Sequence, residues 1–144
     1  MPFCHAVLKA PKPKPTPYPH ALNTLGDHIR RKRFELELLQ KDVARQIGVD
    51  EATIWNWENN ATIPEIRFVP RIIEFLGYDP LPPVENLAER LKAYRMRMGL
   101  SRKKLAEHLG IDPGTLGRWE SRRGHPSRKL HQLLAEALNS SVSN

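Results

Sequence analysis

The sequence predicts an all-α protein made of two tandem domains, each of four to five short helices. The chain has 144 residues, of which 40% are hydrophobic and 27% charged, a composition typical of folded globular domains. When it is shifted against itself by 62 positions, Leu25 falls on Leu87 and no gap is needed until Leu76 falls on Leu138. Apolar residues recur at helical spacing in both copies. A duplicated helical unit accounts for all of these observations.

Identical residues mark the repeat along its whole length. The identical pairs are Leu25 and Leu87, Arg33 and Arg95, Leu38 and Leu100, Lys41 and Lys103, Ala44 and Ala106, Gly48 and Gly110, Asp50 and Asp112, Thr53 and Thr115, Trp57 and Trp119, Glu58 and Glu120, Pro64 and Pro126, Glu74 and Glu136, and Leu76 and Leu138. We therefore predict one domain over residues 25–76 and a second over residues 87–138. A linker over residues 77–86, stiffened by three prolines, separates them.

The two ends of the chain are expected to lie outside the folded domains. Residues 1–24 hold six prolines, with three lysines interleaved among the later ones, which favours an extended or disordered arm over a helix. Residues 139–144 are expected to form a disordered tail. Cys4, His5 and His20 lack a fourth ligand at a recognisable spacing, so no metal and no other cofactor is expected.

Each repeat begins with an amphipathic helix, which Thr24 and Asn86 are placed to cap. A second helix follows and ends at Gly48 or Gly110, since glycine readily adopts the left-handed conformation that closes a helix.

Asp50 and Asp112 come two residues after these glycines and can cap a third helix. Pro64 and Pro126 are then expected to begin another helix, because a proline at the first helical position loses no hydrogen bond.

This pattern resembles the phage Cro and repressor type of helix-turn-helix protein, the XRE-like family, whose fold is lambda-repressor-like. The residues that carry the resemblance are QKDVARQIGV, ATIWNWE and the later proline in the first copy, and their counterparts in the second. The resemblance implies two partly buried ion pairs, Arg33 with Glu58 and Arg95 with Glu120. Each would tie the first helix of its domain to the end of the third.

In such a motif the third helix, here residues 51–59 and 113–121, lies in the major groove of DNA. If Ile54 and Trp57 point inward, spacing places a set of residues outward toward the bases. This base-reading set is Glu51, Ala52, Trp55 and Asn56 in the first copy and Pro113, Gly114, Gly117 and Arg118 in the second. Asn56 suits adenine and Arg118 suits guanine, so the two copies are expected to read different bases.

Phosphate contacts are expected at the start of the second helix, on the third helix, and just beyond it. The expected phosphate-binding residues are Gln40, Lys41, Thr53, Asn59, Asn60, Arg102, Lys103, Thr115, Arg122 and Arg123.

Charge is unevenly divided between the copies. The net charge of +7 comes from residues 87–144, which hold 12 basic against 5 acidic residues, whereas residues 25–86 hold 8 against 11. The second copy therefore has the more favourable field for DNA.

At about 3.3 Å per residue the extended linker spans about 33 Å, close to the 34 Å at which one face of DNA recurs. We therefore expect the linker to be drawn out when both copies contact one DNA.

The sequence thus predicts a sequence-specific double-stranded DNA-binding protein that acts as a transcription regulator. The alternative is a protein-interaction module, such as an antitoxin-like partner, or an accessory protein of a mobile element in which only one repeat binds DNA. Besides DNA, the sequence leaves two further partners open, a second protein or a second copy of the chain in a homodimer. Ser101 and Lys104 match the S-x-x-K pattern of some acyl enzymes, but Ser101 also suits a helix cap and no partner motif follows, so no catalysis is expected.

The location expected for this chain is the cytoplasm, with nucleoid association in a prokaryote. One cysteine forms no intrachain disulfide, and neither a signal peptide nor a membrane-spanning stretch is visible. No membrane partner is expected.

Overall fold

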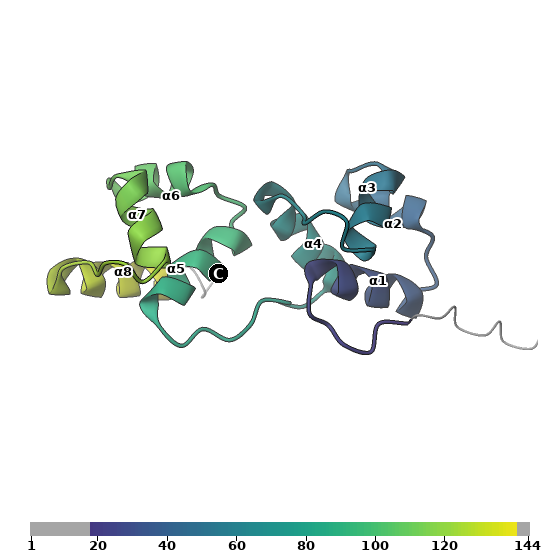
Figure 1. The fold of residues 1–144 in the computed structure, drawn as a ribbon, viewed down its shortest axis with the longest axis horizontal. Helices are drawn as coiled ribbons and strands as arrows, with labels where there is room; N and C mark the ends of the chain where they lie inside the picture. Colours follow the sequence, from purple (N-terminus) through teal and green to yellow (C-terminus); the bar gives the residue numbers. More distant parts are fainter. Residues whose placement is uncertain (1–17, 141–144) are drawn as a thin grey trace, which may run out of the picture.

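A computed structural model describes residues 18–140, which contain eight α-helices, one 3-10 helix and no strand. The helices form two bundles that lie side by side along the long axis (Figure 1). The first bundle comprises α1 (Leu25–Glu35), α2 (Gln40–Ile47), α3 (Glu51–Glu58), the 3-10 helix η1 (Ile66–Phe68) and α4 (Val69–Leu76). The second comprises α5 (Leu87–Arg97), α6 (Arg102–Leu109), α7 (Pro113–Glu120) and α8 (Arg128–Ser140). The predicted all-α tandem fold is confirmed.

The expected disorder of the arm concerns mainly residues 1–17, which lie outside the described residues. The described end of the arm lies against α1, where the Tyr18 ring stacks on Phe34 with ring centroids 6.2 Å apart. The Tyr18 hydroxyl also donates to Glu35 at 3.2 Å. At the other end of the chain, α8 continues to Ser140, two residues beyond the expected domain boundary.

Side-chain caps and left-handed glycines begin and end the helices largely as the sequence predicts. Thr24 closes a capping box at α1, and the side chain of Asn86 caps α5. Gly48 and Gly110 end α2 and α6 with φ of 81° and 66°. Glycine takes this conformation without the steric cost that a Cβ atom would impose.

Two sequence expectations about helix starts are wrong. Asp112 caps α7 by accepting from Thr115 N at 3.1 Å, but the Asp50 side chain caps nothing. In the first copy the amide of Thr53 donates instead to the backbone carbonyl of Asp50 at 3.0 Å.

Pro64 and Pro126 also do not begin helices. The chain after Pro64 first makes the 3-10 turn of η1, and α8 begins only at Arg128. Ser127 stands immediately before α8, where its side chain accepts from Leu130 N and its carbonyl from His131 N. These bonds place the cap after Pro126 rather than before it.

Each bundle has its own hydrophobic core. The first core is formed by Ile29, Val43, Ala44, Ile47, Ile54, Trp57, Ile72 and Leu76. The second is formed by Leu91, Leu105, Ala106, Leu116, Trp119, Leu134 and Leu138. The small residues Ala44 and Ala106, an identical pair of the repeat, are buried in both copies. Both cores fix the third helix against the first and second.

One close helix contact was not anticipated from the sequence. In the first bundle, α1 approaches α3 so closely that a Cβ atom on Gly26 would lie 1.8 Å from the carbonyl oxygen of Trp57. No side chain fits at that distance, so α1 requires glycine there. The second copy has Ala88 at the matching position, so α5 carries a Cβ atom where α1 has no room for one.

Among residues 18–140, no helix has both the length and the apolar character needed to cross a lipid bilayer. The same part of the chain has no group of three or more His, Cys, Asp or Glu side chains placed to hold a metal ion. Of the three metal-ligand candidates considered above, Cys4 and His5 lie outside the described residues.

Candidate nucleic-acid interface

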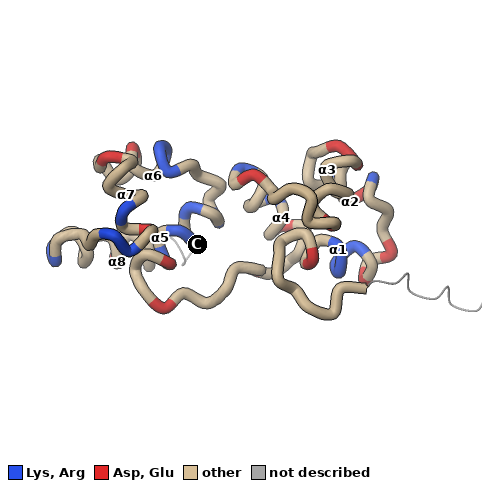
Figure 2. Tube along the Cα trace, viewed as in Figure 1, with Lys and Arg blue, Asp and Glu red and all other residues tan. Residues whose placement is uncertain are grey.

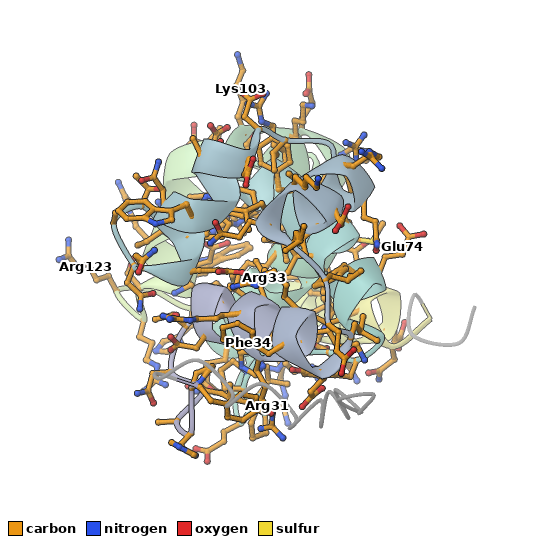
Figure 3. The ribbon with its side chains drawn as sticks, turned by 90° about the vertical axis from the view of Figure 1, so that its right-hand side faces the viewer. Arg31, Arg33, Phe34, Glu74, Lys103 and Arg123 are labelled. Atoms are coloured by element: carbon orange, nitrogen blue, oxygen red, sulfur yellow. The ribbon has the colours of Figure 1, made fainter. Side chains whose placement is uncertain are left out.

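A buried ion pair holds α1 against the end of α3. Arg33 donates to both carboxylate oxygens of Glu58, from Nε at 2.6 Å and from Nη2 at 2.8 Å, and Glu58 is 2% exposed. The guanidinium also donates to the carbonyl of Leu38 at 3.3 Å and lies 4.4 Å from the centre of the Phe34 ring. Figure 3 shows Arg33 lying within the body of the molecule, whereas Arg31 points away from it. The pair fixes the direction in which α3 leaves the core.

The second bundle contains the matching ion pair. Arg95 donates to Glu120 from Nε at 2.8 Å and from Nη2 at 3.2 Å, and to the carbonyl of Leu100 at 3.4 Å. Burial raises the pKa of Glu120, but hydrogen bonds from Arg95 and Arg102 outweigh it and leave the pKa below its ordinary value. Both ion pairs that the resemblance implies are therefore present.

Two residues expected to bind phosphate are engaged with these glutamates. Gln40 donates to Glu58 at 2.8 Å, and Arg102 donates to Glu120 at 2.8 Å. Each stands at the first position of the second helix of its copy, so that helix is tied to the end of the third. The sequence carried a signal for this: Gln40 and Arg102 align in the repeat, and each is a long donor 18 residues before its glutamate. The Arg102 side chain is still 54% exposed and can donate outward as well.

The outer faces of α3 and α7 carry the residues expected to read bases. Ile54 and Trp57 point into the first core, and Leu116 and Trp119 into the second. The remaining surface of the two helices comprises Glu51, Ala52, Trp55, Pro113, Gly114 and Arg118, which are exposed, and Asn56 and Gly117, which are half-buried. All eight predicted positions thus lie outside the cores.

The expected phosphate-binding lysines are exposed at the starts of α2 and α6. Lys41 and Lys103 each follow the first residue of their helix. Figure 3 shows Lys103 projecting from one edge of the molecule and Arg123 from another. Thr53 and Thr115 are half-buried, near the starts of α3 and α7. These residues lie at or near the ends of the helices that frame each turn.

The residues just beyond the third helix make contacts within their own bundle. Asn60 and Arg122 occupy matching positions, both with positive φ, of 56° and 59°. Asn60 accepts from Thr24 at 2.8 Å, and Arg122 pairs with Glu89, so each ties the end of the third helix to the start of the first. The neighbouring Asn59 donates to the carbonyl of Trp55 at 2.8 Å. Of the expected phosphate contacts in this region, exposed Arg123 has the least involvement with its own bundle.

The charge difference between the copies is visible on the folded chain. Figure 2 shows acidic and basic segments in both bundles, with basic segments on each of α5 to α8. Residues 87–144 carry +7 and residues 25–86 carry −3. The surface of the second bundle is therefore the stronger attractor for a polyanion.

The serine of the S-x-x-K pattern has a structural role. Ser101 is the N-cap of α6, and its hydroxyl accepts from the amide of Lys104 at 3.2 Å. This bond satisfies one of the free amides at the start of the helix.

Comparison with known proteins bears out the duplication. A family model described as helix-turn-helix matches residues 29–81 and again residues 91–143. No curated protein and no solved structure matches the chain. The two matched segments begin 62 residues apart, which is the register of the internal repeat.

Proposed function

The chain belongs to the XRE-type helix-turn-helix family in two tandem copies, and we propose that it binds specific sites on double-stranded DNA through α3 and α7. Domains of this family bind DNA and are typically found in transcription regulators. The finer proposal is that this chain regulates transcription by occupying its site and thereby blocking or recruiting other proteins.

The observation that carries the proposal is the division of α3 and α7 into two faces. One face is locked by the core and by the buried glutamate at the helix end, and the other offers the predicted base-reading residues to solvent. A helix held on one side and free on the other can enter the major groove without rearrangement. In Figure 1, α2, α3 and α6 lie toward the edge of the molecule opposite the linker.

The two helices offer different chemistry to the groove. On α7, Gly114 and Gly117 present no side chain beyond the backbone, so Arg118 is the longest exposed side chain and suits guanine O6 and N7. On α3, Asn56 suits adenine N6 and N7, while Glu51 suits cytosine N4 but repels phosphate. The site is therefore expected to have two unlike halves.

Selection of bound duplexes from a random pool, using the full chain, tests the proposal. The expected outcome is an enriched site with a guanine in one half, whose binding weakens by about 1 to 3 kcal/mol in Arg118→Asn. Arg31→Asn, a change at an exposed arginine of α1 that points away from the body of the molecule, serves as the control and should leave the preference unchanged. Failure to enrich any sequence would overturn the proposal.

A second function has an observation in its favour. Trp55, in the middle of α3, is 52% exposed, and Ile63 in the following loop is 88% exposed. Large apolar side chains on a bundle of net negative charge suit a protein surface better than a phosphate backbone. In this alternative the first bundle binds a protein and the second holds the complex on DNA. Trp55→Ala would then leave DNA affinity unchanged, whereas direct reading by α3 requires a loss of affinity.

A further inference from the structure

The two bundles contact each other directly as well as through the linker. Helix α4 packs against α5, and the Asp79 carboxylate in the linker pairs with Arg97 Nε at 2.6 Å. The turn after α5 lies against the start of α4, where Gly99 meets the ring of Pro70. Figure 1 shows α4 as the element of the first bundle that faces the second.

Gly99 leaves no room for a side chain at this contact. A Cβ atom there would lie 2.9 Å from Pro70 Cγ, 3.1 Å from Pro70 Cδ and 3.4 Å from the carbonyl oxygen of Ile66. A proline ring cannot rotate away as a flexible side chain can, because it is closed onto its own backbone. Any larger residue at position 99 must therefore push the bundles apart.

The first copy shows that the turn itself tolerates a side chain. Its matching residue is Glu37, with φ of 54° against 65° for Gly99. The two turns are closed by the same bonds: Leu38 N donates to Arg33 O and Leu100 N to Arg95 O, both at 3.0 Å. Since Glu37 adopts nearly the same conformation, the positive φ favours glycine at position 99 but does not require it. The neighbouring Pro70 of the other bundle adds a steric reason that the first copy lacks.

The Asp79 side chain adds a second restraint. One carboxylate oxygen accepts from Leu81 N at 2.9 Å, which holds the turn around Pro80, and the other pairs with Arg97. The first copy has Glu35 where the second has Arg97. The positive charge that attracts the Asp79 carboxylate is therefore present only in the second copy, which is the copy that Asp79 contacts. The linker is thus anchored to the second bundle and does not act as a free spacer.

We propose that the two bundles form one rigid unit, set by Gly99 and the Asp79 to Arg97 pair, and that the chain therefore selects DNA whose two subsites have one fixed separation and phase. This inference rests on the proposed function. It replaces the expectation of a linker drawn out on DNA, because drawing it out would break both contacts. Holding the bundles in place before binding avoids the cost of ordering them on the DNA.

The first test uses the free protein and needs no DNA. Residual dipolar couplings from the two bundles of the full chain are expected to fit one common alignment tensor. In Gly99→Glu, which introduces the matching residue of the first copy, the couplings are expected to require a separate alignment tensor for each bundle. Gly110→Ala is the matched control, because Gly110 has nearly the same φ, 66°, and nothing within 4 Å of a Cβ atom. Two tensors in the unaltered chain would overturn the inference.

Arg97→Glu gives an independent variant should Gly99→Glu fold poorly, since its side chain is 37% exposed and outside both cores. It reverses the charge facing Asp79 and is likewise expected to release the bundles. A single tensor in both Gly99→Glu and Arg97→Glu would overturn the inference.

The second test varies DNA spacing on the selected site. Two added base pairs rotate one subsite by about 70° and shift it by about 7 Å. Affinity of the unaltered chain is expected to fall at least about tenfold, and that of Gly99→Glu by less than about threefold. Equal losses in both proteins would overturn the fixed spacing while leaving DNA binding in place. Absence of binding to any duplex would overturn the proposed function and the fixed spacing together, whatever the couplings of the free protein show.

Discussion

Replacing Arg33 with methionine should destabilise the first bundle more than the equivalent change destabilises the second. In Arg33→Met the Glu58 carboxylate, with a side chain only 1% exposed, retains one neutral donor, Gln40. Breaking a buried ion pair in this way costs about 3 kcal/mol, a roughly hundredfold change in the unfolding equilibrium. Loss of the bond to the Leu38 carbonyl adds to the cost.

The second bundle has a spare cation. In Arg95→Met, Glu120 keeps Arg102, whose Nε lies 2.8 Å from the carboxylate, so about half the loss is expected, about 1.5 kcal/mol. Arg102→Met alone should cost less than about 1 kcal/mol, because that side chain is more than half exposed. Removing both arginines should bring the loss back to about 3 kcal/mol, since no cation then faces Glu120.

Native-state hydrogen exchange of the full chain separates these effects, since amides of α3 and α7 report the opening of their own bundles. The free energy of opening should fall most in α3 for Arg33→Met. As a control, Arg33→Met with Glu58→Met should recover most of that loss, because an apolar pair leaves no buried charge. Equal losses in the two bundles, or no loss in either, would refute the different roles assigned to Gln40 beside Glu58 and to Arg102 beside Glu120.

Three other predictions follow from the contacts described. In thermal unfolding, Gly26→Ala should destabilise the first bundle by about 1 to 3 kcal/mol despite the better helix propensity of alanine, whereas Ala88→Gly should cost about 1 kcal/mol. A stabilising effect of Gly26→Ala would disprove the close contact with α3. The lowered pKa of Glu120 means that its carboxylate contributes stability above pH 4.5, which is lost as the pH falls through the lowered value; carbon-13 titration should give a midpoint below 4.5, and a higher one would contradict this. Lys103→Ala should reduce the salt slope of DNA binding by about 0.9, and Lys41→Ala by less, because the first bundle has net negative charge; equal effects measured by fluorescence anisotropy would argue against the second bundle as the main electrostatic contact.

The features that the sequence predicted correctly are those with local or duplicated signals. The caps at Thr24 and Asn86 could be predicted because each capping side chain and the amide from which it accepts lie within three residues of each other. The partners in the pairs of Arg33 with Glu58 and of Arg95 with Glu120 are distant in sequence. These pairs could be predicted because the family resemblance implies them and because the same residues recur in both copies. Their positions in the structure follow from packing the first helix against the third.

Most features that the sequence did not predict depend on distances between elements, but the missing cap at Asp50 is a local exception. The amide of Thr53 donates to the backbone carbonyl of Asp50, whereas the amide of Thr115 donates to the side chain of Asp112, and the matching sequences do not reveal this difference. Gly26 and Gly99 looked like ordinary glycines, and only the positions of Trp57 and Pro70 show why no Cβ atom fits there. A comparison of the two copies could have drawn attention to these positions, because Gly26 matches Ala88 and Gly99 matches Glu37.

Footprinting of the full chain beside Arg118→Asn, on a site selected by the unaltered protein, tests the central claim most directly. If α3 and α7 both read DNA, the unaltered chain will protect two major-groove segments. Arg118→Asn will then weaken protection of the segment that contains guanine and shift the preference in that half alone. Protection confined to one groove segment, or a loss spread evenly over all sequences, would contradict the claim that both helices read bases.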